Sequence, residues 1–320
     1  MRKISFILAL LVLTIGLAAC GADSKNEGEG KENNGGNSEQ AETMTLKHEL
    51  DETTFDKNPK KVVVFDFGVL DTMDKLGIEV IGLPKTSIPN YLSKYEDDKY
   101  ENVGSLKEPD FEKIHALDPD LIIISGRQSS LYDQFKEIAP TIYMGLDTTK
   151  YMESFKYNVE TIGEIFGKED QAKTELTAID DKIKSLSDEV SQLDGKALVM
   201  LANEGNMSAY GSNSRFGIIH DVFGFKQADE NIEATTHGQS ITSEYILEKN
   251  PDYLFVIDRS AAIGGEVKAN ETIENDLVKK TNAYKNGKII YLDPESWYLS
   301  GGGLESVAIM VDEIEGALNK

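Results

Sequence analysis

The chain has 320 residues, of which 40% are apolar, so it can bury substantial cores and form about two domains. Its formal net charge of −23 at pH 7 argues against a nucleic-acid-binding protein, which needs a basic surface. The excess of acidic residues indicates a well-solvated surface, so a site for an anion has to be a local basic pocket.

The first twenty residues combine a basic start, an apolar segment and a cysteine. The apolar run 4–19 is short for a membrane span but typical of a signal peptide. The stretch LAAC, residues 17–20, resembles the cleavage motif of bacterial lipoproteins, in which the cysteine is acylated. We therefore expect a signal peptide over residues 1–19 and lipidation of Cys20, with an uncleaved anchor or an ordinary signal peptide as alternatives. Cys20 is the only cysteine, which excludes an internal disulfide.

Residues 20–44 are rich in Gly, Asn, Glu, Ser and Lys and contain almost no large apolar side chain. Such a segment cannot bury enough surface to fold, so it is expected to be a flexible tether. It would hold a soluble body beside a membrane.

Strands and helices alternate over residues 45–166. This pattern predicts a doubly wound N-terminal α/β lobe. The expected strands cover residues 61–65, 79–83, 121–124 and 141–144, and the expected helices cover 69–76, 111–118 and 130–138.

The middle of the chain has no strand signal. Its apolar residues follow helical spacing from residue 151 to residue 193, with a possible interruption at Gly167. We expect a long, charged connecting helix over residues 167–194, which would act as a stiff connector.

Alternation resumes over residues 195–320, which are predicted to form a C-terminal α/β lobe. Its expected strands cover residues 197–201, 253–257 and 289–292, and its expected helices cover 216–223, 243–250 and 302–318. Two Rossmann-like lobes would thus be joined by a single long helix.

One helix–strand unit occurs twice. The first copy is FEKIHALDPDLIIISGR, residues 111–127, and the second is SEYILEKNPDYLFVIDR, residues 243–259, with an offset of 243 − 111 = 132 residues. Each copy predicts a short helix, a Pro-Asp turn, a strand buried on both faces, and an arginine past the strand, Arg127 or Arg259. Because ligands bind at the carboxyl ends of strands in open α/β sheets, both arginines should face a cleft that closes on an anion.

Arg215 is a third candidate, in a loop beyond the strand at 197–201. Arginine stays charged and presents a planar fork of donors, which suits carboxylate, catecholate or phosphate oxygens. For each arginine taken alone, a surface salt bridge is the alternative.

Three further residues, His237, Trp297 and Tyr298, are candidates for ligand contact. His237, in the loop TTHGQ, could ligate a metal, bind a ligand or be a simple loop histidine. Tyr298 follows Trp297 and precedes SGGG; it could stack on a ligand, bind ferric iron as a phenolate, or pack at the edge between the lobes.

The sequence lacks the motifs of the common enzyme classes. It has no HExxH, no GxSxG, no close His/Cys cluster and no nucleotide-binding fingerprint. We therefore expect a binding protein and not an enzyme, with no intrinsic cofactor.

Taken together, the LAAC motif, the two lobes, the connecting helix and the duplicated E-x-x-[IL]-x-x-x-x-P-D unit resemble class III substrate-binding lipoproteins of ABC iron–siderophore importers. The stretches VGSLKEPDFEKIHALDPDLIIISGRQS, THGQSITSEYILEKNPDYLFVIDR and WYLSGGGLES look like the petrobactin-type, catecholate-siderophore binding proteins of Bacillus. The resemblance covers essentially the whole chain after the signal peptide.

This resemblance implies roles for particular residues. Arginines from both lobes would cradle the anionic ferric catecholate, and they map to Arg127, Arg215 and Arg259. A histidine and a tyrosine, His237 and Tyr298, would complete the coordination of iron when the siderophore supplies only four oxygens. Trp297 would belong to the same ligand-binding site.

The resemblance also implies partners and a location. Glu112 and Glu244, one in each lobe, would dock on arginines of a permease dimer. The protein would be a monomeric receptor that is anchored through Cys20 at the extracytoplasmic face of the cell membrane. It would deliver a ferric siderophore for iron uptake, and petrobactin is the ligand that the resemblance favours. The alternatives are a receptor for haem, cobalamin or a hydroxamate siderophore, or a surface-anchored hydrolase or reductase.

Overall fold

The computed structural model describes residues 42–319. The predicted signal peptide, the lipidated Cys20 and nearly all of the tether over 20–44 lie outside the described residues. Among residues 42–319, no helix is both long enough and apolar enough to cross a membrane.

The N-terminal lobe contains a five-stranded parallel sheet in the order β5-β4-β3-β6-β7. Its central strands are apolar and fully buried, as expected where helices cover both faces of a parallel sheet. The strands are β3 (Val62–Val64), β4 (Gly82–Leu83), β5 (Glu101–Asn102), β6 (Leu121–Ile124) and β7 (Thr141–Tyr143). The helical segments are α1 (Phe67–Lys75), η1 (Asn90–Glu96), α2 (Phe111–Leu117), η2 (Gly126–Leu131), α3 (Tyr132–Lys136) and η3 (Thr148–Lys150).

An antiparallel hairpin precedes this sheet. It consists of β1 (Thr43–Lys47) and β2 (Glu52–Asp56). The buried side chains of β2 alternate with exposed ones, as expected for a strand with one covered face. Among the described residues the first strand begins at Thr43, two residues before the predicted start at residue 45.

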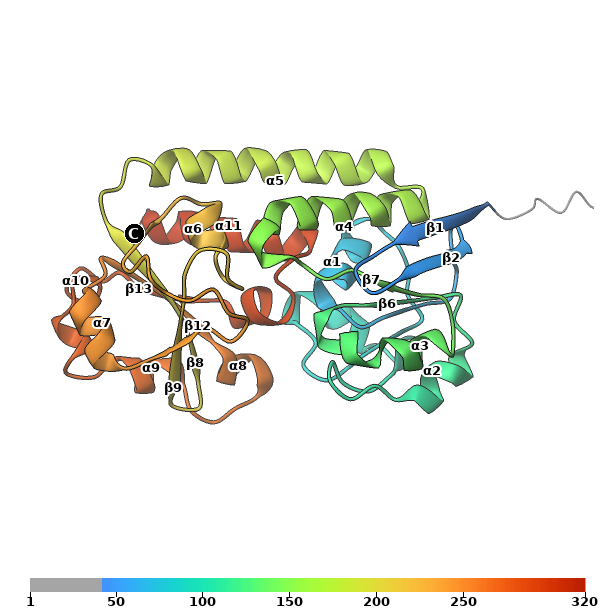
Figure 1. Cartoon of the computed structure of the whole chain (residues 1–320), viewed down its shortest axis with the longest axis horizontal. Helices are drawn as coiled ribbons and strands as arrows, with labels where there is room; N and C mark the ends of the chain where they lie inside the picture. Colours follow the sequence, from blue (N-terminus) through green and yellow to red (C-terminus); the bar gives the residue numbers. More distant parts are fainter. Residues whose placement is uncertain (1–41, 320) are drawn as a thin grey trace, which may run out of the picture. The chain divides into compact units, whose positions relative to one another are not determined.

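Two helices follow β7 in the chain, α4 (Tyr151–Phe166), which lies over the N-terminal lobe, and α5 (Glu169–Val190), which leads to the C-terminal lobe. They are separated at Gly167, which adopts a left-handed conformation with φ of +63° that ends α4. Helix α5 lies within the range 167–194 predicted for the connecting helix, and Figure 1 shows it running along both lobes.

The C-terminal lobe contains a six-stranded sheet in the order β11-β9-β8-β12-β13, with β10 paired to β8. Its strands are β8 (Lys196–Asn203), β9 (Asn206–Tyr210), β10 (Lys226–Gln227), β11 (Gln239–Ile241), β12 (Tyr253–Asp258) and β13 (Ile289–Leu292). Its helical segments are α6 (Ile218–Asp221), α7 (Ser243–Lys249), α8 (Arg259–Ile263), α9 (Ala269–Ile273), η4 (Val278–Lys280), α10 (Asn282–Lys285), η5 (Glu295–Leu299) and α11 (Leu304–Leu318).

This second sheet is mixed. Strands β8, β12 and β13 are parallel, as a Rossmann-like lobe requires. Strand β9 runs antiparallel to both β8 and β11. The sequence did not predict β9 and β11, because both are short and partly polar.

The duplicated unit has the same structure in both lobes. Helices α2 and α7 begin and end at equivalent residues, since 243 − 111 and 249 − 117 both equal 132. Each helix is capped at its start by a side chain, Asp110 or Thr242, and ends at a left-handed residue, Asp118 or Asn250. A proline follows each of these residues, so neither helix continues. Strands β6 and β12, which come next, are both interior strands, each paired on two sides and next to the edge strand of its sheet.

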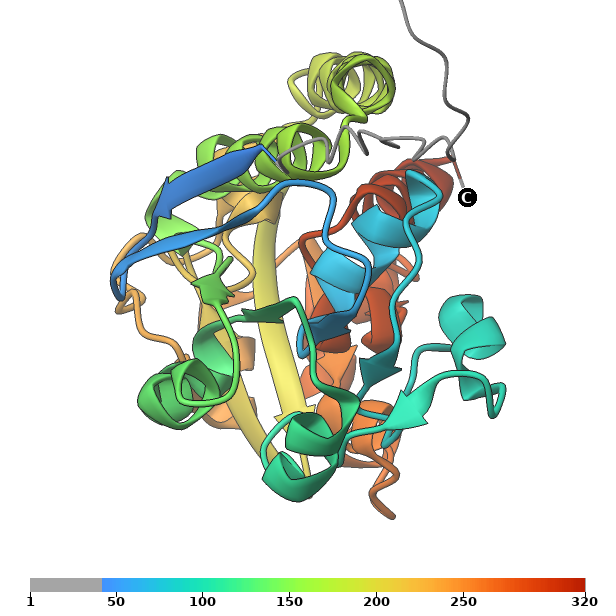
Figure 2. The same cartoon turned by 90° about the vertical axis from the view of Figure 1, so that its right-hand side faces the viewer.

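The C-terminal helix α11 returns to the N-terminal lobe. Figures 1 and 2 show it, in red, beside α1, in blue to cyan. Asp71 of α1 accepts hydrogen bonds from the backbone N–H groups of Glu305 (3.1 Å) and Ser306 (2.9 Å), at the start of α11. This approach requires Gly303, because a Cβ there would lie 1.9 Å from the Asp71 carboxylate. The contact fixes the segment that leads from η5 into α11.

Candidate functional site

A cleft of about 860 Å³ is lined by residues of both lobes. From the N-terminal lobe it takes residues at the carboxyl ends of β3, β6 and β7, together with one face of α4. From the C-terminal lobe it takes residues near the ends of β8 and β12 and the segment η5. The cleft therefore lies where open α/β sheets bind their ligands.

Every arginine within residues 42–319 lines this one cleft: Arg127, Arg215 and Arg259. Arg127 is in η2, directly after β6, and Arg259 begins α8, directly after β12. Arg215 follows β9 in a loop. The structure thus brings together the three arginines that the sequence singled out, although 132 residues separate the outer two (259 − 127).

Tyr298 lies at the centre of the three guanidinium groups. Its backbone carbonyl accepts hydrogen bonds from Arg127 (2.8 Å) and Arg215 (2.7 Å), and its hydroxyl accepts one from Arg259 (2.7 Å). The guanidinium carbons lie 4.3–6.0 Å from the centre of the Tyr298 ring, within the range of cation–π interactions. One residue of η5 therefore holds cations that come from both lobes.

The positive charges of this cluster are poorly neutralised. Asp66 lies 4.0 Å from Arg127, and within residues 42–319 neither Arg215 nor Arg259 has a carboxylate within that distance. Asp66 also caps α1 and accepts a hydrogen bond from Ser125, so its charge is shared among several donors. The cleft therefore offers a local excess of positive charge inside an acidic protein.

The crowding of cations affects the titration of the cluster. Burial lowers the pKa of Arg215, and the nearby charge of Arg127 lowers it further. Burial would raise the pKa of Tyr298, but the hydrogen bond from Arg259 and the charges of the three arginines outweigh this and leave it below its ordinary value. An anion placed among these groups would relieve their mutual repulsion.

His237 and Trp297 also line the cleft, but in different ways. His237 lies in an exposed loop between β10 and β11. Trp297 is 2% exposed, and its indole N–H donates to Glu313 at 2.8 Å, so little of the ring is open to a ligand. Within residues 42–319, no three His, Cys, Asp or Glu side chains form a group that could hold a metal ion.

Several cleft residues were missed by the sequence analysis. They include Lys107, Tyr143, Tyr151, Asn203 and Tyr210. The signal for Tyr143 was its position near the end of the strand predicted over 141–144, whereas Lys107 follows β5, a strand of two exposed residues that the sequence did not predict. Asn203 accepts a hydrogen bond from Arg259, a contact that depends on the pairing of β8 with β12.

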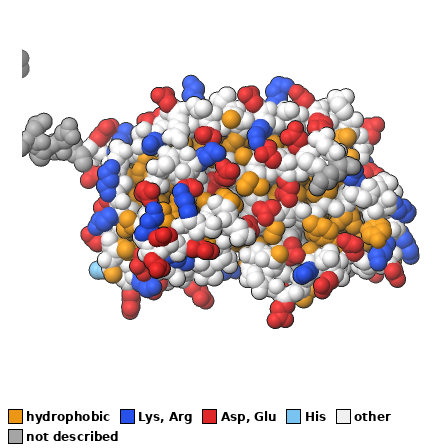
Figure 3. Space-filling view, turned by 180° about the vertical axis from the view of Figure 1, so that it is seen from behind, with side chains coloured by type: hydrophobic (Ala, Val, Ile, Leu, Met, Phe, Trp, Pro, Cys, Tyr) orange, Lys and Arg blue, Asp and Glu red, His pale blue; other side chains and the backbone are white. Residues whose placement is uncertain are grey.

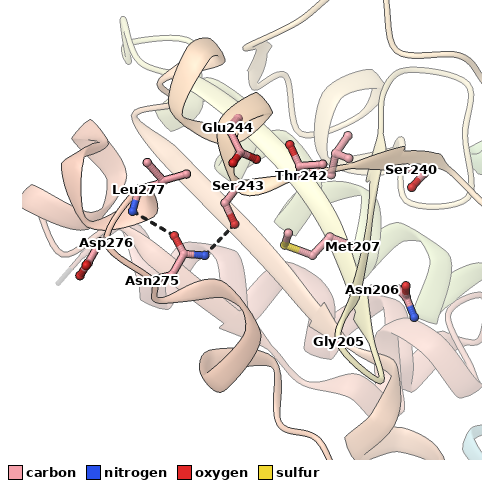
Figure 4. A pocket seen from close by; sticks show the side chains of 11 residues that line it. Gly205, Asn206, Met207, Ser240, Thr242, Ser243, Glu244, Asn275, Asp276 and Leu277 are labelled. Carbon is pink, nitrogen blue, oxygen red and sulfur yellow. Dashed lines mark hydrogen bonds between the residues drawn. The ribbon is translucent and has the colours of Figure 1, made fainter.

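The two candidate docking glutamates lie outside the cleft. Glu112 and Glu244 occupy the second position of α2 and of α7, and both are exposed. The carboxylate of Glu244 accepts hydrogen bonds from the residue's own backbone N–H and from the side chain of Thr242. Both lower the pKa of Glu244, so this carboxylate is anionic at neutral pH. Glu244 borders a second, open hollow of about 700 Å³, in which Asn275 donates to the Ser243 hydroxyl (2.6 Å; Figure 4).

Comparison with known proteins assigns the chain to a family. Residues 62–296 match the periplasmic binding protein family. The chain belongs to this family. It is 54% identical over 324 residues to the petrobactin-binding protein YclQ of Bacillus subtilis, and the match covers 100% of both chains. The crystal structure of YclQ agrees with a TM-score of 0.86 at 59% identity, over 87% of this chain and 99% of that chain.

A second solved structure supports the same fold. The catecholate-siderophore binding protein VctP of Vibrio cholerae has a TM-score of 0.81 at 39% identity, over 86% of this chain and 100% of that chain. The class III periplasmic-binding-protein fold predicted from the sequence is confirmed. The curated relatives are named as binding proteins and not as enzymes.

Proposed function

We propose that this periplasmic binding protein captures a ferric siderophore in the cleft and delivers it to an ABC permease for iron uptake. The observation that carries the proposal is the convergence of Arg127, Arg215 and Arg259 on one cleft. The 54% identity to a petrobactin-binding protein supports a catecholate of the petrobactin type as the ligand.

The chemistry of the cleft suits an anionic chelate with aromatic rings. Guanidinium groups donate strong hydrogen bonds to charged oxygens, and the oxygens of a ferric catecholate carry its negative charge. Tyr143, Tyr210 and Tyr298 line the same cleft and offer aromatic surface to the catechol rings. When a siderophore supplies only four oxygens, His237 and Tyr298 would complete the coordination of iron.

The attraction for the ligand is local. The net charge of −23 opposes the approach of an anion, and Figure 3 shows acidic and basic side chains interspersed over the face seen from behind. Binding energy must therefore come from the three guanidinium groups inside the cleft.

Location and delivery complete the proposal. Acylation of Cys20 would anchor a monomeric receptor to the extracytoplasmic face of the cell membrane, and the residues between Cys20 and the start of β1 at Thr43 would give it reach. The exposed Glu112 and Glu244 would each meet an arginine of a two-fold permease dimer. The protein would bind its ligand without turning it over and would need no intrinsic cofactor.

An affinity panel tests this function. The wild-type chain is titrated with ferric petrobactin, iron-free petrobactin, a ferric hydroxamate, haem and cobalamin. We expect ferric petrobactin to bind with a Kd near the nanomolar range, about −12 kcal/mol, and intact chelate to be recovered afterwards. Tighter binding of haem, cobalamin or the hydroxamate would overturn the assignment of the ligand, and released iron or altered siderophore would indicate an enzyme.

A further inference from the structure

The three arginines of the cleft donate to oxygen atoms of uncharged groups. Arg127 and Arg215 both donate to the backbone carbonyl of Tyr298, at 2.8 and 2.7 Å. Arg259 donates from Nε to the hydroxyl of Tyr298 at 2.7 Å and from Nη1 to the side-chain amide of Asn203. Because arginine has no acceptor, it is the amide oxygen of Asn203 that faces the guanidinium group. Since Asn203 also lines the cleft, this contact belongs to the wall that a ligand would meet.

The fold fixes Asn203 beside Arg259. Asn203 is the last residue of β8, and Glu204 and Gly205 make the turn into β9. Both turn residues have positive φ, 47° and 80°, as a tight hairpin turn of type I′ requires. The backbone N–H of Glu204 donates to the hydroxyl of Ser260 at 2.9 Å, which ties the turn to the start of α8. The side chain of Asn203 is therefore held at the residue that begins α8, Arg259.

This arrangement leaves the charge of Arg259 available. Among residues 42–319, Arg259 has no carboxylate within 4.0 Å. The neighbouring carboxylate of Asp258 binds the backbone instead, where it accepts from the N–H groups of Ala261 (3.0 Å) and Ala269 (2.8 Å). A carboxylate in place of the Asn203 amide would have the same shape, but it would form an ion pair with Arg259 and compete with the anionic oxygens of a ligand.

We propose that Asn203 is a positioning residue that holds Arg259 in the cleft without neutralising it, so that the cleft favours the more negative of two ligands with the same shape. This inference rests on the proposed function and adds a determinant of selectivity to the same site. It assigns two separable effects to one side chain. The hydrogen bond places the guanidinium group, and the neutrality of the amide preserves its attraction for an anion.

The test uses one chelator with two metal ions. Petrobactin is loaded with Fe³⁺ or with Ti⁴⁺, so that the two complexes share their oxygens but the ferric complex carries one more negative charge. Both complexes are titrated into the wild type, Asn203→Asp and Asn203→Ala, and circular dichroism identifies the folded variants.

The two variants should differ in kind. We expect Asn203→Asp to lower the ratio of the two affinities, ferric over titanium(IV), by about tenfold, because the added charge repels the more negative complex more strongly. We expect Asn203→Ala, which adds no charge, to weaken both complexes by about threefold to tenfold, the effect of one lost hydrogen bond, and to keep the wild-type ratio. Asn270→Asp is the matched control, because it adds the same charge at an exposed position of α9 outside the cleft, and it should bind both complexes as the wild type does.

The other outcomes overturn the inference or the function beneath it. A wild-type ratio in folded Asn203→Asp would show that the neutrality of the amide has no consequence for the ligand. Wild-type affinities in Asn203→Ala would show that Arg259 does not need to be held, and this arm decides whether or not Asn203→Asp folds. Either result refutes the inference alone, whereas a wild type that bound neither complex would refute the proposed function itself.

Discussion

Asp71 is a carboxyl group inside the molecule, and it holds the C-terminal helix to the N-terminal lobe. It is 1% exposed and accepts hydrogen bonds from the start of α11 and from the hydroxyl of Tyr91 at 3.1 Å. Tyr91 also contacts Ser300 at 2.6 Å, two residues after Tyr298. Asp71 therefore helps to fix the backbone that presents Tyr298 to the three arginines.

The pH dependence of stability should report on Asp71. Burial raises its pKa to about 7, although the hydrogen bonds from Ser306, Glu305 and Tyr91 work in the opposite direction. The folded state holds this proton more tightly than the unfolded chain does. Protonation of Asp71 therefore contributes fully to the free energy of unfolding below about pH 4, and this contribution is lost as the pH rises to about 7. Over that range the loss should be several kcal/mol, with about 4 as an upper value.

Urea unfolding of the wild type and Asp71→Asn at pH 4, 5.5, 7 and 8 measures this effect. The variant loses an acceptor and should be less stable overall, but its free energy of unfolding should lack the decline between pH 4 and pH 7. Asp181→Asn, at an exposed position of α5, serves as the control and should keep the decline. Parallel pH curves for the wild type and Asp71→Asn would contradict the assignment.

At the scale of elements, the sequence predicted those units whose signals are local. Helices α2 and α7 could be located because a Pro-Asp turn follows each, and β6 and β12 because each contains an apolar run of four or more residues. The repeat then placed Arg127 and Arg259 at equivalent strand ends, and the structure has them there.

What the sequence could not predict depends on tertiary contacts. Strands β9 and β11 exist through their pairing with each other and with β8, and their own residues give only a weak strand signal. Two of the three arginine hydrogen bonds that Tyr298 accepts go to its backbone carbonyl, which every residue has, so no pattern of residue types marks them. Trp297 was predicted beside the ligand, but its hydrogen bond to Glu313 depends on the packing of η5 against α11.

The duplicated unit should also separate binding from delivery. Glu112 and Glu244 are exposed and outside the cleft, so the double variant Glu112→Ala/Glu244→Ala should bind ferric siderophore as the wild type does. Truncating one partner of a desolvated charge pair at an interface costs about 2–5 kcal/mol, so uptake of iron by cells that carry the variant should fall at least about tenfold.

The control for this experiment is Glu160→Ala, at an exposed position of α4 away from α2 and α7, which should leave uptake unchanged. Normal uptake with the double variant would contradict the docking proposal. A loss of siderophore affinity in the same variant would place the glutamates in the binding site instead.

At the scale of the whole molecule, the lobes share one apolar core. A single cluster of buried side chains extends from Leu46 through α4, α5 and α11 to Phe255 and Ile257 in β12. Because packed cores resist continuous deformation, closure around a ligand should be a small hinge motion and not a large rotation of the lobes. The arginines from the two lobes are accordingly already gathered around Tyr298.

The most direct measurement is a titration of ferric petrobactin into the wild type and into the triple variant Arg127→Ala/Arg215→Ala/Arg259→Ala. A hydrogen bond to a charged group contributes about 1.5–3 kcal/mol, so the triple variant should bind at least about a thousandfold more weakly while keeping the circular dichroism of the folded chain. A triple alanine variant of the surface residues Lys173, Lys184 and Lys226 controls for the loss of charge. Wild-type affinity in the folded arginine variant would contradict the claim that this cluster binds the siderophore.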